Sequence, residues 1–259
     1  MKHAFHHTGK YCASAHAALF YASNWISALT VSFAVLLIIF TAVLLSNNLF
    51  AVLSALYPLP DGFFWILHIM QFLLLSPLAI GLLYFYTDLF RAAHGDGPIN
   101  VPPSVIFSPY ASGTSILHAW LQSLFSLPLL SLIPASFIPL YFAGSKLLDP
   151  NAFTVSTLLW LGSVIAFLAV LYLNARLLPA LFLSAVYPER SFGHVIRMTW
   201  HTTKNTVLTG ILLQLGLLAA AAVSVLLTAG ILFFFYVLPF SVFTYIGYCH
   251  ALSHRCDIL

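Results

Sequence analysis

The sequence predicts an all-α polytopic membrane protein. It predicts six transmembrane helices arranged as three helical hairpins, plus an interfacial amphipathic helix on the cytoplasmic side. Hydrophobic residues make up 61% of the 259-residue chain and charged residues only 6%, whereas soluble domains carry about 25% charged residues. Long apolar stretches recur along the chain, and its Lys and Arg residues gather at one set of their ends. These observations exclude an ordinary soluble domain.

Six apolar stretches are long enough to cross a bilayer, whose hydrocarbon core of about 30 Å needs about 20 helical residues. The predicted spans cover residues 25–45, 64–86, 116–142, 154–178, 206–228 and 231–249. A cytoplasmic segment (1–24) precedes this transmembrane domain (25–250), and a cytoplasmic tail (251–259) follows it. The first stretch is interpreted as a span because it exceeds the ~7–15 apolar residues of a signal peptide.

The basic residues predict the orientation, because short loops rich in Lys and Arg stay in the cytoplasm. Lys146 falls at one set of span ends. The other eight fall at the opposite set: Lys2, Lys10, Arg91, Arg176, Arg190, Arg197, Lys204 and Arg255. We therefore expect a multi-pass protein of the cell membrane with both termini in the cytoplasm.

The connection between the fourth and fifth spans predicts an amphipathic helix over residues 191–204, with Ser191 as its N-cap. Five basic residues recur at steps of four, three, four and three: Arg190, His194, Arg197, His201 and Lys204. The other side of this helix carries mostly apolar residues: Phe192, Val195, Ile196, Thr199 and Trp200. Such a helix is typical of the headgroup plane, where it attracts anionic lipid. A helix that merely packs under the bundle would show the same pattern.

Arg176 lies in the otherwise apolar stretch "LYLNARLLPALF", near Asn174. Burial of an arginine at the bilayer centre costs at least ~2.5–3.5 kcal/mol, so we expect it at the cytoplasmic end of the fourth span. There its guanidinium would snorkel into the headgroups, and the chain would kink at Pro179. The alternative is a functional intramembrane charge paired with Asp88.

The stretches "SPLAIGLLYFYTDLFRAAHGDG", "NARLLPALFLSAVYPERSFGHVIRMTWHTTKN" and "LPFSVFTYIGYCHAL" carry a family resemblance. The chain resembles the DUF975-like family of uncharacterised bacterial six-helix integral membrane proteins. The matching positions are Pro77, Leu78, Gly81, Arg91, Gly95, Asp96, Pro188, Ser191, Thr199 and Lys204. Thr199 stands where the family usually has Ser, and Asn205 where it often has Gly. The resemblance implies the fold and a membrane location, but no activity.

The sequence gives no support for catalysis, for a cofactor or for nucleic-acid binding. It has no phosphate-binding loop, zinc-protease motif or nucleophile elbow. Its acidic residues lie at span ends or in loops, which disfavours ion-coupled transport. His250 and His254, four residues apart near Cys256, are weak metal candidates. Because this spacing is common by chance, no metal is expected.

Two hypotheses of function remain. The first is a non-enzymatic accessory protein that binds membrane lipids, anionic ones in particular, or a protein partner through Arg176 and the five basic residues. The alternative is a channel or passive transporter whose polar cavity is lined by His68, Gln71, Asn174 and Gln214. These four would have to converge on one cavity. A small-residue stripe in the fifth span lets a neighbouring helix or a second copy pack closely: Gly216, Ala220, Ser224 and Thr228.

Overall fold

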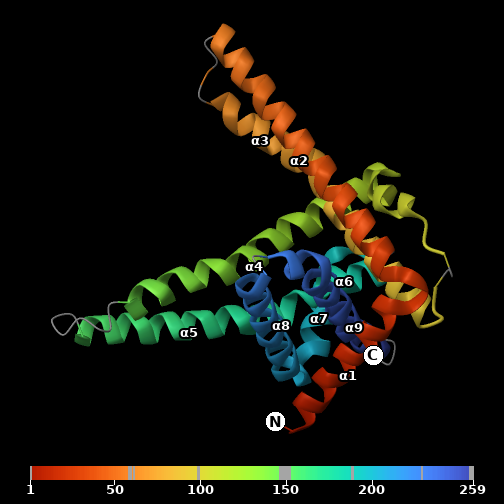
Figure 1. The fold of residues 1–259 in the computed structure, drawn as a ribbon, viewed down its shortest axis with the longest axis vertical. Helices are drawn as coiled ribbons and strands as arrows, with labels where there is room; N and C mark the ends of the chain where they lie inside the picture. Colours follow the sequence, from red (N-terminus) through yellow and green to blue (C-terminus); the bar gives the residue numbers. More distant parts are fainter. Residues whose placement is uncertain are drawn as a thin grey trace. The chain divides into compact units, whose positions relative to one another are not determined.

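The computed structural model describes residues 2–57, 60, 62–97, 100–145, 153–187, 190–228 and 230–256, which are helical apart from short turns (Figure 1). The α-helices are α1 (Lys2–Phe20), α2 (Asn24–Leu56), α3 (Gly62–Ala93), α4 (Gly113–Ser145), α5 (Phe153–Leu177), α6 (Pro179–Val186), α7 (Phe192–Thr202), α8 (Val207–Thr228) and α9 (Leu238–Cys256). Short 3-10 segments are η1 (Tyr21–Ser23), η2 (Pro103–Tyr110) and η3 (Thr203–Asn205), and η4 (Phe233–Val237) is π-helical.

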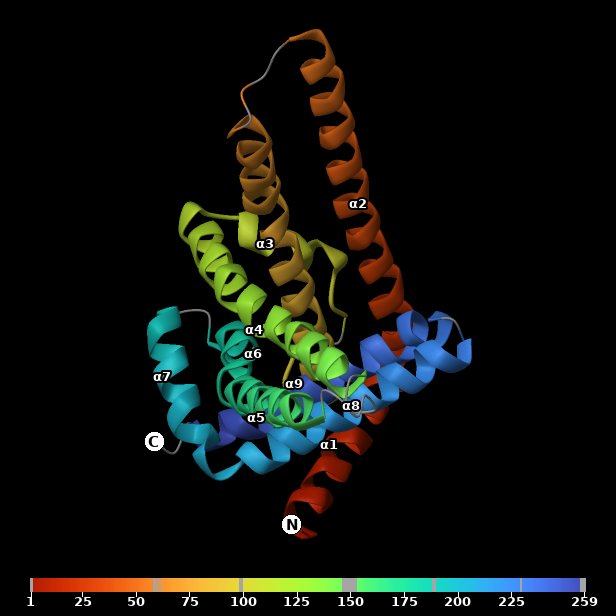
Figure 2. The same ribbon diagram turned by 90° about the vertical axis from the view of Figure 1, so that its left-hand side faces the viewer.

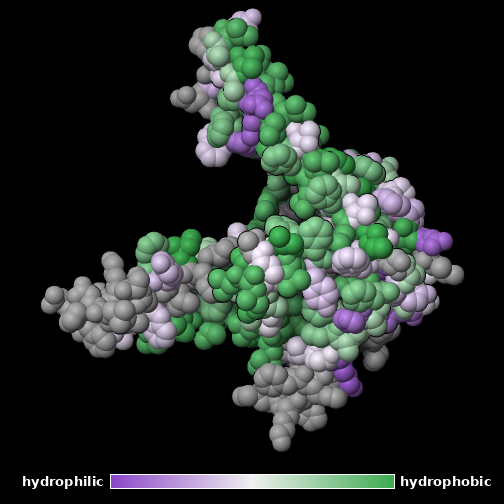
Figure 3. Space-filling model, in the orientation of Figure 1, coloured by the Kyte–Doolittle hydropathy of each residue, from purple (hydrophilic) through white to green (hydrophobic). Residues whose placement is uncertain are grey.

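Six helical segments are long and apolar enough to cross a membrane, which confirms the predicted all-α multi-pass class. They are Asn24–Leu56, Gly62–Ala93, Gly113–Ile133, Thr157–Val186, Val207–Thr228 and Phe233–Ser253. Their outer faces carry large exposed apolar side chains, among them Leu226 and Leu227. Figure 3 shows hydrophobic side chains (green) over most of the visible surface of these helices. A lipid-facing surface has this composition.

Several spans end later than predicted. Helix α2 continues to Leu56 instead of ending at residue 45, because Ser46 does not interrupt it. The Ser46 hydroxyl donates to the carbonyls of Ala42 (2.7 Å) and Val43 (3.1 Å) within the same helix. At 1.5 Å per residue, the 33 residues of α2 extend about 50 Å. The fourth span runs on to Val186.

The chain forms two compact units, one of residues 15–123 and the other of residues 1–14 and 124–259. In the first unit, α2 and α3 lie side by side (Figures 1 and 2). The Asn24 amide donates to the Leu89 carbonyl at 3.3 Å, and the hydroxyls of Ser32 and Tyr86 lie 2.8 Å apart. Polar bonds therefore accompany the apolar packing of this hairpin.

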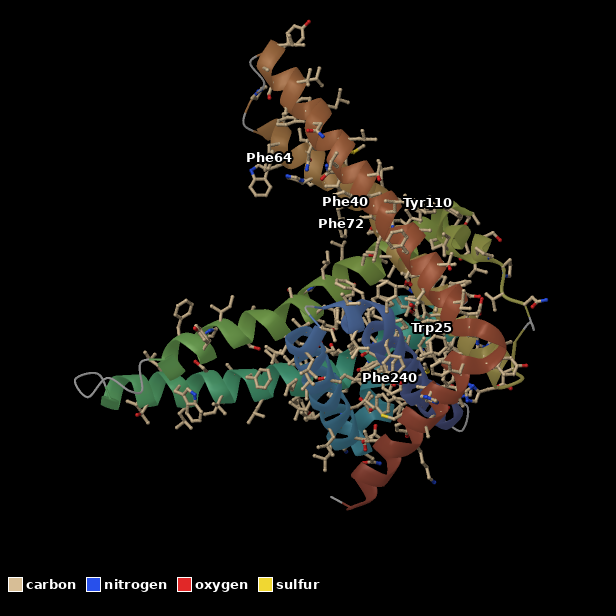
Figure 4. The ribbon with its side chains drawn as sticks, in the orientation of Figure 1. Trp25, Phe40, Phe64, Phe72, Tyr110 and Phe240 are labelled. Carbon is tan, nitrogen blue, oxygen red and sulfur yellow. The ribbon has the colours of Figure 1, made fainter. Side chains whose placement is uncertain are left out.

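Segment η2 lies directly against α3. A Cβ atom on Gly81 would lie 1.9 Å from the backbone oxygen of Ile106, so no other residue fits there without moving backbone. The Tyr110 hydroxyl, labelled in Figure 4, donates to the Leu74 carbonyl. The "SPLAIG" stretch of α3 is therefore the surface on which η2 docks.

In the second unit, α5 packs along α8, while α8, η4 and α9 form a hairpin. Helix α6 contacts α7 and α9. Ala180, Leu183 and Val195 form a small buried core between α6 and α7. The helix is interrupted at Leu178 and resumes at Pro179, near the predicted kink. These contacts place α7 beside the end of the fourth span.

The first two residues of the small-residue stripe of α8 do not make the close helix contact that its spacing predicts. Nothing lies within 4 Å of a Cβ built on Gly216, and Ala220 is exposed. The close approach occurs instead at Gly210, where a Cβ would lie 3.1 Å from Cβ of Ala175 on α5. Ser224 of the stripe is buried, so the stripe as a packing face stays a prediction, while the observed close approach of α5 is to the first turns of α8.

Candidate functional site

Helix α7 confirms the predicted amphipathic helix. It covers Phe192–Thr202, and η3 continues it to Asn205. Ser191 occupies the N-cap position with extended backbone, φ −60° and ψ 141°. Its carbonyl accepts from the amides of His194 (2.9 Å) and Val195 (3.1 Å). Its side chain makes no capping bond, so the cap is provided by the backbone alone.

One face of α7 is buried in its own unit. The Phe192 ring contacts Phe125 edge to face, with centroids 5.3 Å apart. Val195 and Thr199 are fully buried, and the Thr199 hydroxyl donates to the Val195 carbonyl at 2.7 Å. This intrahelical bond satisfies the hydroxyl and explains how Thr sits on a buried face.

The opposite face of α7 carries the basic residues. All five predicted members are exposed, and we call them the basic face: Arg190, His194, Arg197, His201 and Lys204. Exposure on one side and burial on the other follow from the 3.6-residue period of the helix. The structure thus brings together the residues that the 4-3-4-3 spacing singled out.

Arg190 is anchored before α7 begins. Its guanidinium carbon lies 4.7 Å from the centroid of the Tyr187 ring, and Nη1 lies 3.2 Å from the sulfur of Met198. The Tyr187 hydroxyl in turn donates to the Ser253 carbonyl on α9 at 3.4 Å. Arginine stacked on an aromatic ring in this way keeps its remaining N–H groups free for a ligand.

Arg176 departs from the expected snorkelling position. Only 5% of its surface is exposed, and its guanidinium carbon lies 4.0 Å from the centroid of the Trp200 ring. The Thr203 hydroxyl lies 3.5 Å from the Arg176 carbonyl oxygen. Because α7 and η3 cover the end of α5, the side chain folds beneath Trp200 instead of extending outward. Cation–π stacking and the C-terminal turn of α5 both stabilise the charge there.

The hydrogen bonding of Arg176 is incomplete. Its Nε is buried and has no hydrogen-bond partner. No ion pair to Arg176 is present within the described residues of its unit. Asp88, the alternative partner, belongs to the other unit. The intramembrane ion pair therefore stays a prediction.

The polar residues predicted to line a cavity fall into two groups, one in each unit. In the first unit, His68 Nδ1 lies 2.9 Å from Oε1 of Gln71, whose amide donates to Ser46 (2.6 Å) and Asn47 (2.9 Å). A hydrophilic patch (purple) interrupts the apolar surface of the α2–α3 hairpin in Figure 3. These side chains thus satisfy one another.

Asn174 and Gln214 belong to the second group. Both are buried, and so is Tyr245 on α9, against which the Gln214 side chain lies. Within the part of the chain that is described, Oδ1 of Asn174 has no hydrogen-bond partner, and the Gln214 amide and the Tyr245 hydroxyl bond at most each other. The sequence pattern missed Tyr245 because an aromatic residue in an apolar helix resembles ordinary core.

The weak metal candidates at the end of α9 are only partly described. His250 is half-buried, whereas the side chains of His254 and Cys256 lie outside the described residues. In the ranges that the structure does describe, no three His, Cys, Asp or Glu side chains are placed to hold a metal ion.

Three contacts of Arg176 and Arg190, with Trp200, Tyr187 and Met198, are absent from the predictions. Trp200 stands on the predicted apolar side of α7, and nothing in the sequence links it to a residue 24 positions earlier. No family model, curated protein or solved structure matches the chain. The resemblance to the DUF975-like family therefore stays a prediction from the residues alone.

Proposed function

We propose that this protein is a non-enzymatic integral membrane protein that binds anionic lipid headgroups through the basic face of α7, as an accessory factor of the cell membrane. The exposure of all five basic residues opposite a buried face carries the proposal. A helix that merely packs would also have a polar outer face, but such a face could carry charges of either sign, whereas residues 190–204 contain no Asp or Glu.

The expected energy is modest. Each basic residue near an anionic surface contributes about 1 kcal/mol, so Arg190, Arg197 and Lys204 together contribute about 3 kcal/mol. Exposed charges are screened over about 10 Å at 0.1 M salt. Lipid retained by the basic face should therefore be lost as salt is raised.

The test replaces Arg190, Arg197 and Lys204 together by Gln. The parent and the triple variant are compared by native mass spectrometry for phosphatidylglycerol retained at low salt. The matched control replaces Lys2, Lys10 and Lys146 by Gln, which removes three charges elsewhere. We expect the α7 variant to retain much less lipid than the control. If both variants lose the same amount of lipid, net charge alone explains the binding. If the α7 variant retains as much lipid as the parent, the proposal is refuted.

The orientation belongs to the same proposal, because the basic face must meet the cytoplasmic leaflet. The eight-to-one distribution of Lys and Arg supports cytoplasmic termini. Reporter fusions after residue 259 test this. A phosphatase reporter, active only outside the cytoplasm, should be inactive and a fluorescent reporter should be bright. The reverse pattern would place α7 at the wrong leaflet for anionic lipid.

The buried polar atoms of the second unit favour a second candidate, a passive conduit for a small polar solute. In the described part of the chain, Oδ1 of Asn174 lacks a partner, and the Gln214 amide and the Tyr245 hydroxyl bond at most each other. In a membrane span such groups are expensive and often functional. Solute flux into proteoliposomes tests it, with Gln214→Leu as the variant and Gln71→Leu as the control. Flux that neither variant changes would remove this candidate.

A further inference from the structure

Arg176 is a buried cation whose hydrogen-bonding capacity is not used. Its side chain is 5% exposed, and Nε is enclosed without a partner. No carboxylate contacts it among the described residues of its unit. A buried charge is normally paired with an opposite charge and hydrogen-bonded. The Trp200 ring and the end of α5 supply only part of this, so the free N–H points to an anion.

The surroundings of Arg176 suit an anion that arrives from the headgroup layer. Trp200 covers one face of the guanidinium at 4.0 Å, and its indole is 39% exposed at the surface. Arg197 precedes Trp200 by three residues and Lys204 follows it by four. Such spacings make side chains neighbours on a helix, so Trp200, predicted on the apolar side, lies at the border of the basic face, where Arg197 and Lys204 are exposed.

We propose that Arg176 binds the phosphate group of one phospholipid, with Trp200 as a movable cover and with Arg197 and Lys204 attracting the headgroup at the rim. The planar guanidinium matches phosphate oxygens through two parallel N–H bonds. This inference rests on the proposed function, because the basic face of α7 brings the lipid to the site. It differs in one measurable property: a recessed charge pair is screened by salt much less than an exposed one.

The experiment uses the full chain in maltoside micelles, which contain no phosphate, with added phosphatidylglycerol. Native mass spectrometry counts the lipids retained at high salt. We expect one per chain in the parent protein. Arg176→Lys keeps the charge but loses the planar fork, and should retain ~tenfold less, since hydrogen bonds to charged groups contribute that much or more. The triple Gln variant of the basic face should lose its low-salt lipids and keep the high-salt one. The two proposals can therefore fail separately.

A second set of probes identifies the ligand chemistry. Oleate, an anionic lipid without phosphate, should not replace phosphatidylglycerol at high salt. Inorganic phosphate is compared with chloride at equal ionic strength. Displacement of the retained lipid by phosphate alone shows that the free anion suffices, and no displacement shows that the acyl chains are needed. Either outcome supports a phosphate site, provided that Arg176→Lys no longer retains the lipid at high salt.

The proposal is overturned if Arg176→Lys, with an unchanged elution volume and circular dichroism spectrum, retains as much lipid at high salt as the parent. It is also overturned if oleate is retained equally well. Should Arg176→Lys fail to fold, Trp200→Ala provides the second test. Removal of the cover should speed exchange of the retained lipid at high salt, whereas an unchanged exchange rate would contradict a role for Trp200 as cover.

Discussion

The indole Nε1 of Trp120 donates to the carbonyl oxygen of Leu73 at 2.7 Å, which is the carbonyl that Pro77 leaves without its helical donor. In an α-helix, the amide of residue i bonds the carbonyl of residue i−4, and proline has no amide hydrogen. An unsatisfied backbone carbonyl in lipid costs several kcal/mol. Trp120 thus compensates for the proline in α3 and ties the start of α4 to it.

Trp120→Phe should destabilise the protein by ~1–3 kcal/mol, because the half-buried Leu73 carbonyl loses its donor within an apolar span. The free energy of unfolding is measured by denaturant titration in micelles. Trp65→Phe, at an exposed position of α3, is the matched control and should change little. In a Pro77→Ala background the helical amide returns, so the cost of Trp120→Phe should shrink. An equal cost in both backgrounds would show that the indole does not serve this carbonyl.

Gly81→Ala should displace η2 from α3, because the new Cβ would lie 1.9 Å from the Ile106 oxygen. Backbone cannot yield as a flexible side chain can, so we expect a loss of a few kcal/mol, as for other overpacked sites. Proteolysis within residues 100–112 should become faster. Gly162→Ala is the control, since nothing lies within 4 Å of its Cβ position and alanine favours helix. Equal protease resistance of the two variants would contradict the close contact.

The six spans could be predicted because length and apolarity are properties of the sequence alone. The exposed side of α7 could be predicted for the same reason, since periodicity fixes which residues share a face. The helix ends could not be predicted. The Ser46 hydroxyl, for example, donates to the Ala42 carbonyl within α2, so the helix continues through this polar residue. Arg176 was expected at the end of its span, but the apolar segment runs on to Val186, and the contact of Arg176 with Trp200 depends on how α7 folds back over α5. The spacing of residues along the sequence does not indicate that α7 packs back over α5.

The same limit applies to α8. A stripe of small residues identifies a face, but not the helix that approaches it or the turn at which it does so. In the structure the approach of α5 is at Gly210, one to two turns before the predicted stripe at Gly216. Only the packed neighbours of each glycine distinguish the two positions.

Substitution by valine separates these two glycines. At Gly210 a Cβ would already lie 3.1 Å from Ala175 and 3.3 Å from the Tyr248 hydroxyl, so Gly210→Val should push α5 and α9 away from α8. We expect a loss of ~1–3 kcal/mol, typical of overpacking. Gly216→Val meets open space and should be tolerated. The midpoint of thermal aggregation in micelles measures both. If Gly216→Val lowers the aggregation midpoint more than Gly210→Val does, the predicted stripe is the packing face, against either a helix of the same chain or a second copy.

Cys12 on α1 should react with maleimides at higher pH than an ordinary thiol. Burial raises the pKa of its thiol, because the thiolate loses solvation, and the thiolate is the reactive form. At pH 8 the folded protein therefore holds a smaller thiolate fraction than the unfolded chain. Its labelling rate should keep rising well above ~pH 8.5, where an unperturbed thiol is half ionised. The pH of half-maximal rate is compared before and after denaturation, in a Cys249→Ser, Cys256→Ser background that leaves Cys12 alone. Steric shielding would lower the rate at every pH without moving that midpoint, so identical midpoints would show that burial of α1 does not act on the thiol.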